Sequence, residues 1–166
     1  RLILSNKGEP MDLEDYLIPL IKMDRKAHLA VACAADHEVL SAVFMALKDG
    51  LIEASLVGEK IMIESLAHKY HYDLALCTII DESDNILACE KAVRLVSSHH
   101  ADFLMKGLVD TSILLKAVLN KEWGLRSNNV LSHVALFSLK HEKRVYAITD
   151  GAMNIAPDLE QKKQII

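Results

Sequence analysis

The sequence has few of the residues that mark secreted, zinc-binding or membrane proteins. It contains only three cysteines, Cys33, Cys77 and Cys89, which lie in apolar surroundings and form no CxxC pair. An odd, scattered set of this kind predicts buried free thiols in a reducing compartment, not a disulfide framework or a zinc site. No apolar run approaches the ~18 residues that span a bilayer, and no segment resembles a signal peptide. We therefore expect a cytoplasmic protein without a membrane contact.

The sequence also has no excess of basic over acidic residues. The 166 residues include 19 Lys and Arg against 23 Asp and Glu, for a net charge of −4. This balance argues against bulk electrostatic binding of nucleic acid, although it leaves room for a local basic pocket. The hydrophobic content of 51% is that of a soluble globular protein, and the length fits one ordinary domain with a real core.

Patterns of buried strands and amphipathic helices alternate along the chain at intervals of roughly 25 residues. This alternation is typical of βαβ units, and we predict a doubly wound α/β fold with a mostly parallel sheet and helices on both faces. The last two strands are joined by a short charged turn, which predicts a hairpin and therefore a mixed sheet. The expected strands are 28–35, 52–57, 74–80, 101–105, 134–139 and 145–149, and further helices are expected at 12–23 and from Asp158.

The stretch from Ala101 to Thr111 is the most informative for function. A short apolar strand leads into Lys106-Gly107, and Asp110-Thr111 then opens a helical pattern. A strand, a glycine turn and a helix start place free backbone N–H groups and a lysine at the carboxyl end of the strand. That arrangement suits phosphate or another anion. The alternative is a plain turn in which Lys106 faces solvent.

Two other polar groups follow predicted strands, where ligands of α/β sheets gather. Asp36-His37-Glu38 could form a metal cluster, but adjacent residues at a helix start point apart, so helix capping by Asp36 is the favoured interpretation. Thr149-Asp150-Gly151, with Asn154, follows the last strand, where Asp150 could equally be a turn or capping residue.

Ser132 and His133 precede a strand. Their side chains face opposite ways on an extended segment, which disfavours a catalytic Ser-His pair. A Ser132 hydroxyl that binds a ligand is the preferred interpretation.

Several segments together resemble the phosphate acetyl/butyryl transferase family, most closely its phosphate butyryltransferase branch. They occur in the family's order from about Ala30 to the end of the chain. They are 35–36 with 39–40, 104–111, 119–122 with 124–126, 131–134 and 149–159.

The resemblance implies an activity and a scaffold. Members of the family exchange an acyl group between coenzyme A and inorganic phosphate, on a fold similar to the isocitrate and isopropylmalate dehydrogenases. Coenzyme A and phosphate would be substrates, with no resident cofactor. Separately, no set of metal ligands with convincing spacing appears in the sequence, so we expect no metal, and an exposed half of a cleft favours a homo-oligomer. The resemblance also implies that Lys106, Gly107 and Thr111 lie near the phosphate. Ser132 would be a hydroxyl donor, Asp150 and Asn154 would shape the cleft, and Ser132 and Asp150 are the candidates for a catalytic role.

The resemblance covers only the N-terminal half of the family's enzymes. The chain begins at Arg1 without a Met and stops within a helical pattern, so we expect residues 1–166 to be the N-terminal α/β part of a two-domain enzyme and to be inactive alone. The absent half carries other groups credited with substrate binding and proton transfer. Two alternatives stay open: a non-catalytic acyl-CoA-sensing module, and another phosphate-handling enzyme on the same scaffold, such as a decarboxylating dehydrogenase.

Overall fold

A computed structural model describes residues 4–5, 25–127, 129–139, 144–151 and 153–165. The chain divides into two compact units. One consists of residues 23–126, and the other combines residues 1–22 with residues 127–166. Each unit has its own sheet.

The larger unit contains the four-stranded parallel sheet that the alternating pattern predicts. Its strands are β2 (Ala27–Ala32), β3 (Ile52–Gly58), β4 (Cys77–Asp81) and β5 (Phe103–Lys106). They lie in the order β4-β3-β2-β5, and every pairing is parallel. The chain thus builds outward from β2 in one direction and then returns to its other side, which is the doubly wound topology. The predicted fold class is confirmed.

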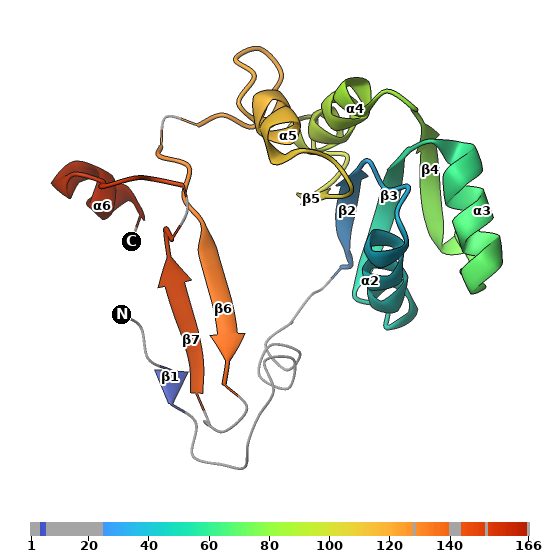
Figure 1. The fold of residues 1–166 in the computed structure, drawn as a ribbon, viewed down its shortest axis with the longest axis horizontal. Helices are drawn as coiled ribbons and strands as arrows, with labels where there is room; N and C mark the ends of the chain where they lie inside the picture. The colour runs from blue at the N-terminus through green and yellow to red at the C-terminus, as the bar shows by residue number, and fades with distance from the viewer. Residues whose placement is uncertain (1–3, 6–24, 128, 140–143, 152, 166) are drawn as a thin grey trace. The chain divides into compact units, whose positions relative to one another are not determined.

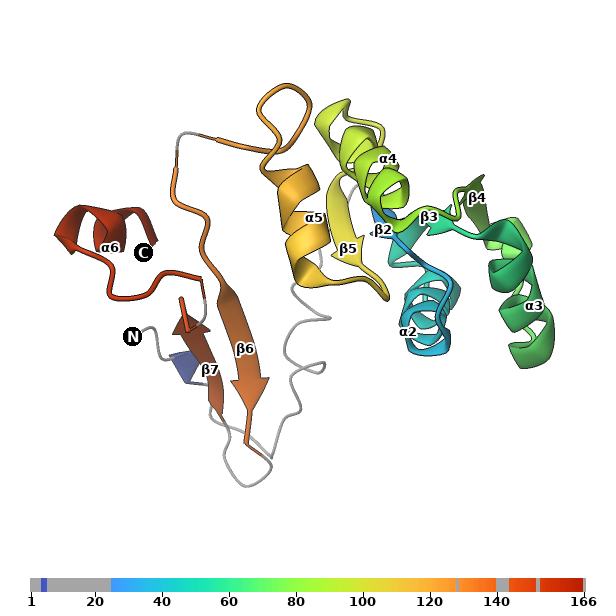
Figure 2. The same ribbon diagram turned by 45° about the horizontal axis from the view of Figure 1, so that its top comes forward.

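Helices cover both faces of this sheet (Figures 1 and 2). Helices α2 (His37–Lys48) and α3 (Lys60–Tyr70) cover one face, and α4 (Asn85–Ser97) and α5 (Thr111–Val118) cover the other. Strand β2 shows why: Leu29 and Val31 pack into the core beneath α2, while Ala30 and Ala32 pack into the core beneath α4. A strand that is buried on both faces is continuously apolar, as its sequence is.

Aspartates begin three of these helices. Asp36, Asp84 and Asp110 are the N-caps of α2, α4 and α5, and each carboxylate accepts a hydrogen bond from a backbone N–H in the first turn. These bonds satisfy donors that a helix start would otherwise leave unpaired.

The third expected strand is shorter than predicted, because Leu74–Leu76 forms a 3-10 turn (η2) whose start is capped by Asp73.

The smaller unit contains a separate antiparallel sheet of three strands. Strands β6 (Val134–Ser138) and β7 (Arg144–Thr149) pair with each other as the predicted hairpin, and β1 (Leu4–Ser5) pairs with β7. The predicted mixed sheet is wrong, because none of these strands pairs with the parallel sheet among the residues that the structure describes. Helix α6 (Leu159–Ile165) follows as expected, whereas the helix expected at 12–23 lies outside the described residues.

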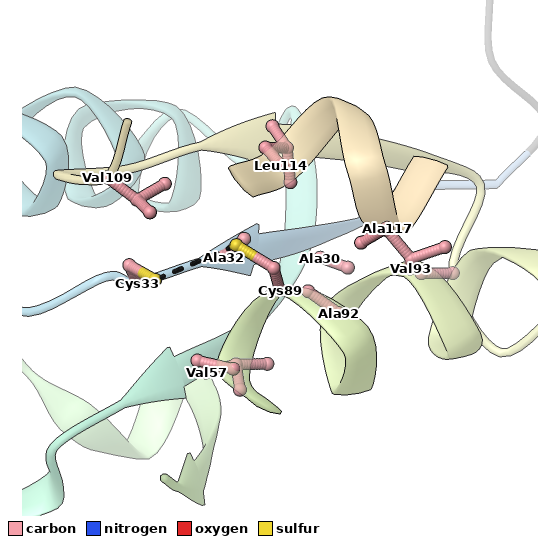
Figure 3. Close-up of a cluster of buried hydrophobic side chains, with 12 residues drawn as sticks. Ala30, Ala32, Cys33, Val57, Cys89, Ala92, Val93, Val109, Leu114 and Ala117 are labelled. Atoms are coloured by element: carbon pink, nitrogen blue, oxygen red, sulfur yellow. Dashed lines mark hydrogen bonds between the residues drawn. The ribbon is translucent and has the colours of Figure 1, made fainter. Parts of the chain in front are cut away.

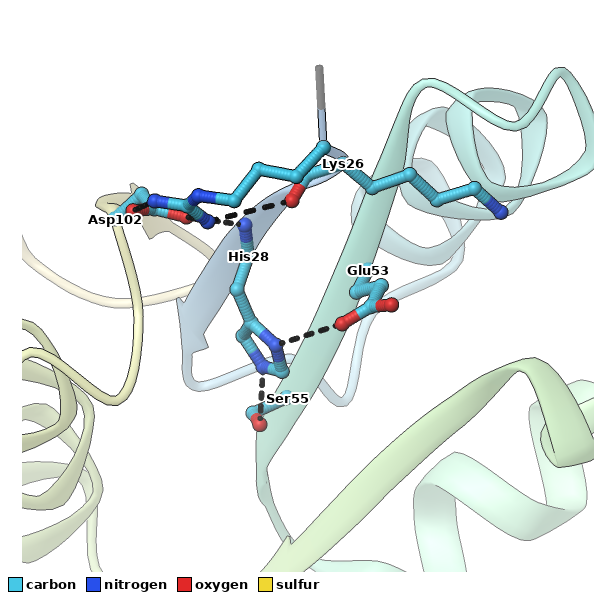
Figure 4. Close-up of polar contacts among 6 residues, drawn as sticks. Lys26, His28, Glu53, Ser55 and Asp102 are labelled. Carbon is cyan, nitrogen blue, oxygen red and sulfur yellow. Dashed lines mark hydrogen bonds and ion pairs between the residues drawn. The ribbon is translucent and has the colours of Figure 1, made fainter. Parts of the chain in front are cut away.

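The amino ends of β2 and β5 are tied together by polar contacts (Figure 4). Arg25 donates two hydrogen bonds, of 2.8 and 2.6 Å, to the carboxylate of Asp102, which also accepts the backbone N–H of His28 at 2.8 Å. The Arg25 guanidinium, helped by this N–H, holds the pKa of Asp102 well below its usual range. Below these contacts, the His28 ring is 2.9 Å from the Ser55 hydroxyl.

Within the described part of the chain, no helix combines the length and the apolar character that crossing a bilayer would require.

Candidate functional site

The carboxyl ends of β2 and β5 form the point where the direction of chain progression reverses. From β2 the chain enters α2 on one face of the sheet, and from β5 it enters α5 on the other. The two connecting loops therefore diverge, and open α/β sheets bind ligands in the crevice between such loops. The loop after β5 is the segment that carries Lys106 and Gly107.

This loop is packed directly on the end of β2. The N–H of Gly107 donates to the carbonyl of Ala32 at 2.8 Å, and the N–H of Leu108 donates to the carbonyl of Cys33 at 3.1 Å. The N–H of Val109 donates to the carbonyl of Gly107 at 3.0 Å. The expectation that the N–H groups of this turn are free for an anion is therefore wrong for these three residues, because neighbouring carbonyls already accept them.

The backbone of Ala32 and Cys33 approaches Gly107 too closely for any side chain at this position. A Cβ at this position would lie 2.2 Å from the Cys33 carbonyl oxygen and 2.6 Å from the Ala32 carbonyl oxygen. Both contacts are to backbone, which cannot move aside as a side chain could. Only glycine lets the two loops approach this closely.

The Lys106 ammonium is folded against its own loop. Its Nζ donates to the Val109 carbonyl at 2.8 Å and to the Gly107 carbonyl at 3.2 Å. An ammonium has three N–H donors, so one remains for a ligand. The positive charge is thus held in a defined position at the carboxyl end of β5, at the start of the loop that leads to α5.

Thr111 is the first residue of α5, directly after the cap Asp110. The Asp110 carboxylate accepts the N–H of Ser112 at 2.7 Å. Hydrogen bonds from Ser112, with the Lys106 charge as a smaller cause, lower the pKa of Asp110. Lys106, Gly107 and Thr111 therefore all lie between the last residue of β5 and the first residue of α5. That they lie near phosphate stays a prediction.

The segment Asp36-His37-Glu38 does not converge on a point. Asp36 caps α2 by accepting the N–H of Val39 at 3.1 Å, the His37 ring stacks on Tyr70 with 3.7 Å between ring centroids, and Glu38 is exposed. Among the described residues, no group of three metal-binding side chains is close enough to hold an ion. The capping interpretation of Asp36 is confirmed.

In the smaller unit, Asp150 and Asn154 join two loops. Asp150 has a left-handed backbone (φ 52°), and its carboxylate accepts the backbone N–H of His133 at 3.3 Å and that of Met153 at 3.2 Å. The Asn154 amide donates to the Asp150 carboxylate and, at 2.9 Å, to the carbonyl of Leu131. The loop that carries Ser132 is thereby held against the loop after β7.

These contacts also bear on proton transfer. Burial by itself would raise the pKa of Asp150, but the hydrogen bonds from Asn154 and from the N–H groups of His133 and Met153 outweigh it and lower the pKa. A carboxylate with a lowered pKa stays ionised and is a weak base at neutral pH. The geometry therefore favours a bracing role for Asp150.

Ser132 is half-buried and the His133 side chain is exposed. Both residues are described, and no hydrogen bond joins the Ser132 hydroxyl to the His133 ring in that part of the chain. The structure thus places Ser132, Asp150 and Asn154 near one another in the smaller unit. In the larger unit it places Lys106, Gly107 and Thr111 at the junction of β5 and α5. The sequence did not predict that the carbonyls of Ala32 and Cys33 anchor the loop after β5, because an apolar strand end carries no signal of such a role.

Comparison with known proteins gives a consistent result. Residues 85–166 match the family model described as "Phosphate acetyl/butaryl transferase". The chain is 43% identical over 152 residues to "Phosphate butyryltransferase" of Clostridium beijerinckii, covering 92% of this chain and 50% of that protein. It is 40% identical over 159 residues to "Probable phosphate butyryltransferase" of Bacillus subtilis, covering 94% and 51%.

A solved structure agrees. The branched-chain phosphotransacylase of Enterococcus faecalis V583 matches 84% of this chain and 47% of its own, with 29% identity and a TM-score of 0.63. The chain spans about half the length of the curated relatives that it matches. By sequence and by fold, the chain is similar to members of the phosphate acetyl/butyryl transferase family, and its residues 85–166 match the model of that family.

Proposed function

We propose that residues 1–166 are the N-terminal α/β part of a two-domain phosphate acyltransferase. The enzyme would transfer a short-chain acyl group, butyryl or branched-chain with acetyl as the alternative, between coenzyme A and inorganic phosphate. The observation that carries the proposal is the 43% identity to a phosphate butyryltransferase over 92% of this chain. The position of Lys106 at the carboxyl end of β5 supports phosphate binding there.

The reaction sets the chemical requirements of the site. A phosphate oxygen attacks the thioester carbonyl, a tetrahedral oxyanion forms, and the coenzyme A thiolate leaves as the acyl phosphate is released. Phosphate must be held by cationic and N–H donors, and the oxyanion needs donors where its charge develops. No covalent enzyme intermediate is needed when the two substrates are held together.

The residues of the larger unit would bind the phosphate. Lys106 has one N–H donor that is not used by its own loop, and its charge is fixed by the other two. Thr111 opens α5, where the positive end of the helix dipole favours an anion. Gly107 would act indirectly, because it allows the loop to pack on β2.

The residues of the smaller unit would have two different roles. We propose that the Ser132 hydroxyl donates a hydrogen bond to substrate, while Asp150 and Asn154 hold the loop that presents it. The hydrogen bonds that join Asp150 and Asn154 to residues 131–133 support the second role. A comparison of Ser132→Ala with Asn154→Ala would separate them, because only the loss of the brace should also lower the thermal stability.

Replacing Lys106 with alanine in the full-length enzyme should raise the phosphate KM or lower kcat by about 10-fold or more. The reason is that one charge-assisted hydrogen bond typically contributes ~1.5–3 kcal/mol. Steady-state kinetics with phosphate as the varied substrate measures the effect. Lys116→Ala is the matched control, since Lys116 is an exposed lysine on the next helix.

The thermal midpoint of each variant should be measured alongside the kinetics, because Lys106 also bonds two carbonyls of its loop. A Lys106→Ala enzyme that folds normally and keeps its phosphate kinetics would remove Lys106 from the site.

We propose that the reaction needs no resident cofactor or metal. Coenzyme A and phosphate are the two substrates, and positioned donors suffice for the chemistry. Prolonged treatment of the full-length enzyme with EDTA should leave its thiol-release activity unchanged. Activity that is lost to EDTA and restored by one divalent metal would contradict this and return attention to Asp36, His37 and Glu38.

We further propose that the enzyme is cytoplasmic and forms a homo-oligomer. The free state of all three cysteines supports a reducing compartment. Light scattering of the full-length protein tests the oligomeric state.

A further inference from the structure

Two of the three cysteines face each other in the core between the sheet and α4. The sulfur atoms of Cys33 and Cys89 are 3.9 Å apart. Cys33 follows the last residue of β2, and Cys89 lies on α4, so the pair joins two elements that are distant in sequence (Figure 3). The two residues are only 5% and 0% exposed. The third cysteine, Cys77, packs instead in the core on the opposite face of the sheet.

A contact with α4 and an unusual backbone conformation together fix the position of the Cys33 thiol. It lies 3.6 Å from the carbonyl of Asn85, one helical turn before Cys89 on α4. Its backbone is left-handed (φ 56°), a conformation that few residues other than glycine adopt. The surroundings therefore fix the thiol toward α4.

Cys33 also connects this pair to the loop after β5. Its carbonyl accepts the N–H of Leu108 at 3.1 Å and lies against Gly107. A covalent change at the Cys33 side chain would therefore act on a residue whose backbone anchors the Lys106 loop.

Burial makes the two thiols slow to react. Burial raises the pKa of Cys33 to about 12, with the neighbouring Cys89 as a further cause, and burial also raises the pKa of Cys89. The thiolate is the reactive form, so oxidation requires a small oxidant and a transient opening of the core.

We propose that Cys33 and Cys89 are an oxidation site at which hydrogen peroxide forms an intramolecular disulfide. The thiolate of one cysteine attacks the peroxide, which gives a sulfenic acid and water. The second thiol then attacks that sulfur, a sulfur–sulfur bond forms, and a second water leaves. Two thiols thus lose two electrons and two protons to one peroxide. The sulfurs must approach from 3.9 Å to about 2.05 Å.

The disulfide should loosen the loop that Cys33 anchors. Drawing the Cys33 side chain toward α4 strains the hydrogen bond between its carbonyl and Leu108. We expect the Leu108 amide to exchange its hydrogen roughly 10-fold faster in the oxidised protein, because local opening controls this rate. An effect on phosphate binding would rest on the proposed function, whereas the disulfide and the exchange rate do not.

The experiment treats the folded full-length protein with hydrogen peroxide, alkylates the remaining thiols after unfolding, and maps the peptides by mass spectrometry. The expected result is a linked Cys33–Cys89 peptide pair that dithiothreitol separates, with Cys77 still alkylated. Met45 is 62% exposed, so its sulfoxide reports that the peroxide dose was sufficient. Cys77→Ala should form the same link, and Cys89→Ala should form none.

Three outcomes would overturn the proposal. They are free thiols at both positions when Met45 is oxidised, sulfinic or sulfonic acid at either cysteine without a link, and a link that includes Cys77. Unchanged exchange at Leu108 in the linked protein would overturn the coupling to the loop.

Discussion

Replacing Gly107 with alanine should destabilise the unit of residues 23–126 by about 3 kcal/mol or more. The added methyl group would lie 2.2 and 2.6 Å from the carbonyl oxygens of Cys33 and Ala32. Both oxygens belong to backbone, so relief requires the loop and the end of β2 to separate. That movement would stretch the hydrogen bonds of the Gly107 and Leu108 N–H groups to these same carbonyls.

Thermal unfolding of the full-length protein, followed by circular dichroism, measures this effect. A loss of this size should lower Tm by about 10 °C or more for a unit of roughly 100 residues. Gly50→Ala is the matched control, because a Cβ there meets nothing within 4 Å but the backbone φ is +71°. Its cost should be the conformational strain alone, about 1 kcal/mol. A Gly107→Ala protein as stable as Gly50→Ala would mean that the loop is not packed on β2 as described.

The helix starts were predictable because their causes are local. Asp36, Asp84 and Asp110 each stand before an apolar helical pattern, and a short polar side chain can reach only the N–H groups of the next turn. The parallel sheet was also predictable, since alternating strands and helices leave few other arrangements. In each case, the residues that decide the structure are near one another in sequence.

The hydrogen-bond partners of the backbone N–H groups in the loop after β5 could not be predicted in the same way. These N–H groups were expected to be free, but the carbonyls that accept them belong to Ala32 and Cys33, far earlier in the chain. Nothing in those residues signals an acceptor, because every residue has a carbonyl. Gly107 was recognised as a turn residue, yet the reason for it is the close approach of the other loop.

The hairpin illustrates a second limit. The pairing of β6 with β7 follows from a short connection, which is a local feature. The sheet that they form also contains β1, a two-residue strand whose Leu4 and Ser5 pair with Val145 and Arg144. So short a segment has no periodicity to detect, and the sequence instead led to a single mixed sheet.

For Asp150 and Asn154 the sequence left two interpretations open: that they shape a substrate cleft, or that Asp150 is a turn or capping residue. Polar residues after a strand are typical both of ligand sites and of loop caps. The structure shows the capping contacts, since the Asp150 carboxylate accepts three donors from its own surroundings. Their part in substrate binding stays a prediction.

Residues 1–166 alone should show no acyl transfer between butyryl-CoA and phosphate. Transfer requires the thioester and the phosphate to be held at near-attack distance with water excluded, and small misplacements are costly. The chain covers half the length of relatives such as the phosphate butyryltransferase of Clostridium beijerinckii. A fixed Lys106 charge can hold an anion at an open loop, but it cannot by itself enclose an acyl group.

A thiol-release assay on the 166-residue chain tests this, with its mass confirmed and its circular dichroism recorded to establish that it is folded. The full-length enzyme is assayed in parallel as the positive control. Inactivity of a folded chain that still binds phosphate would place the missing groups in the remainder of the protein. Robust turnover would contradict the prediction and would mean that the described residues carry the whole mechanism. Ser132 and Asp150 would then be the first candidates for direct catalytic roles, because they are the hydroxyl and the carboxylate that the structure holds on adjoining loops.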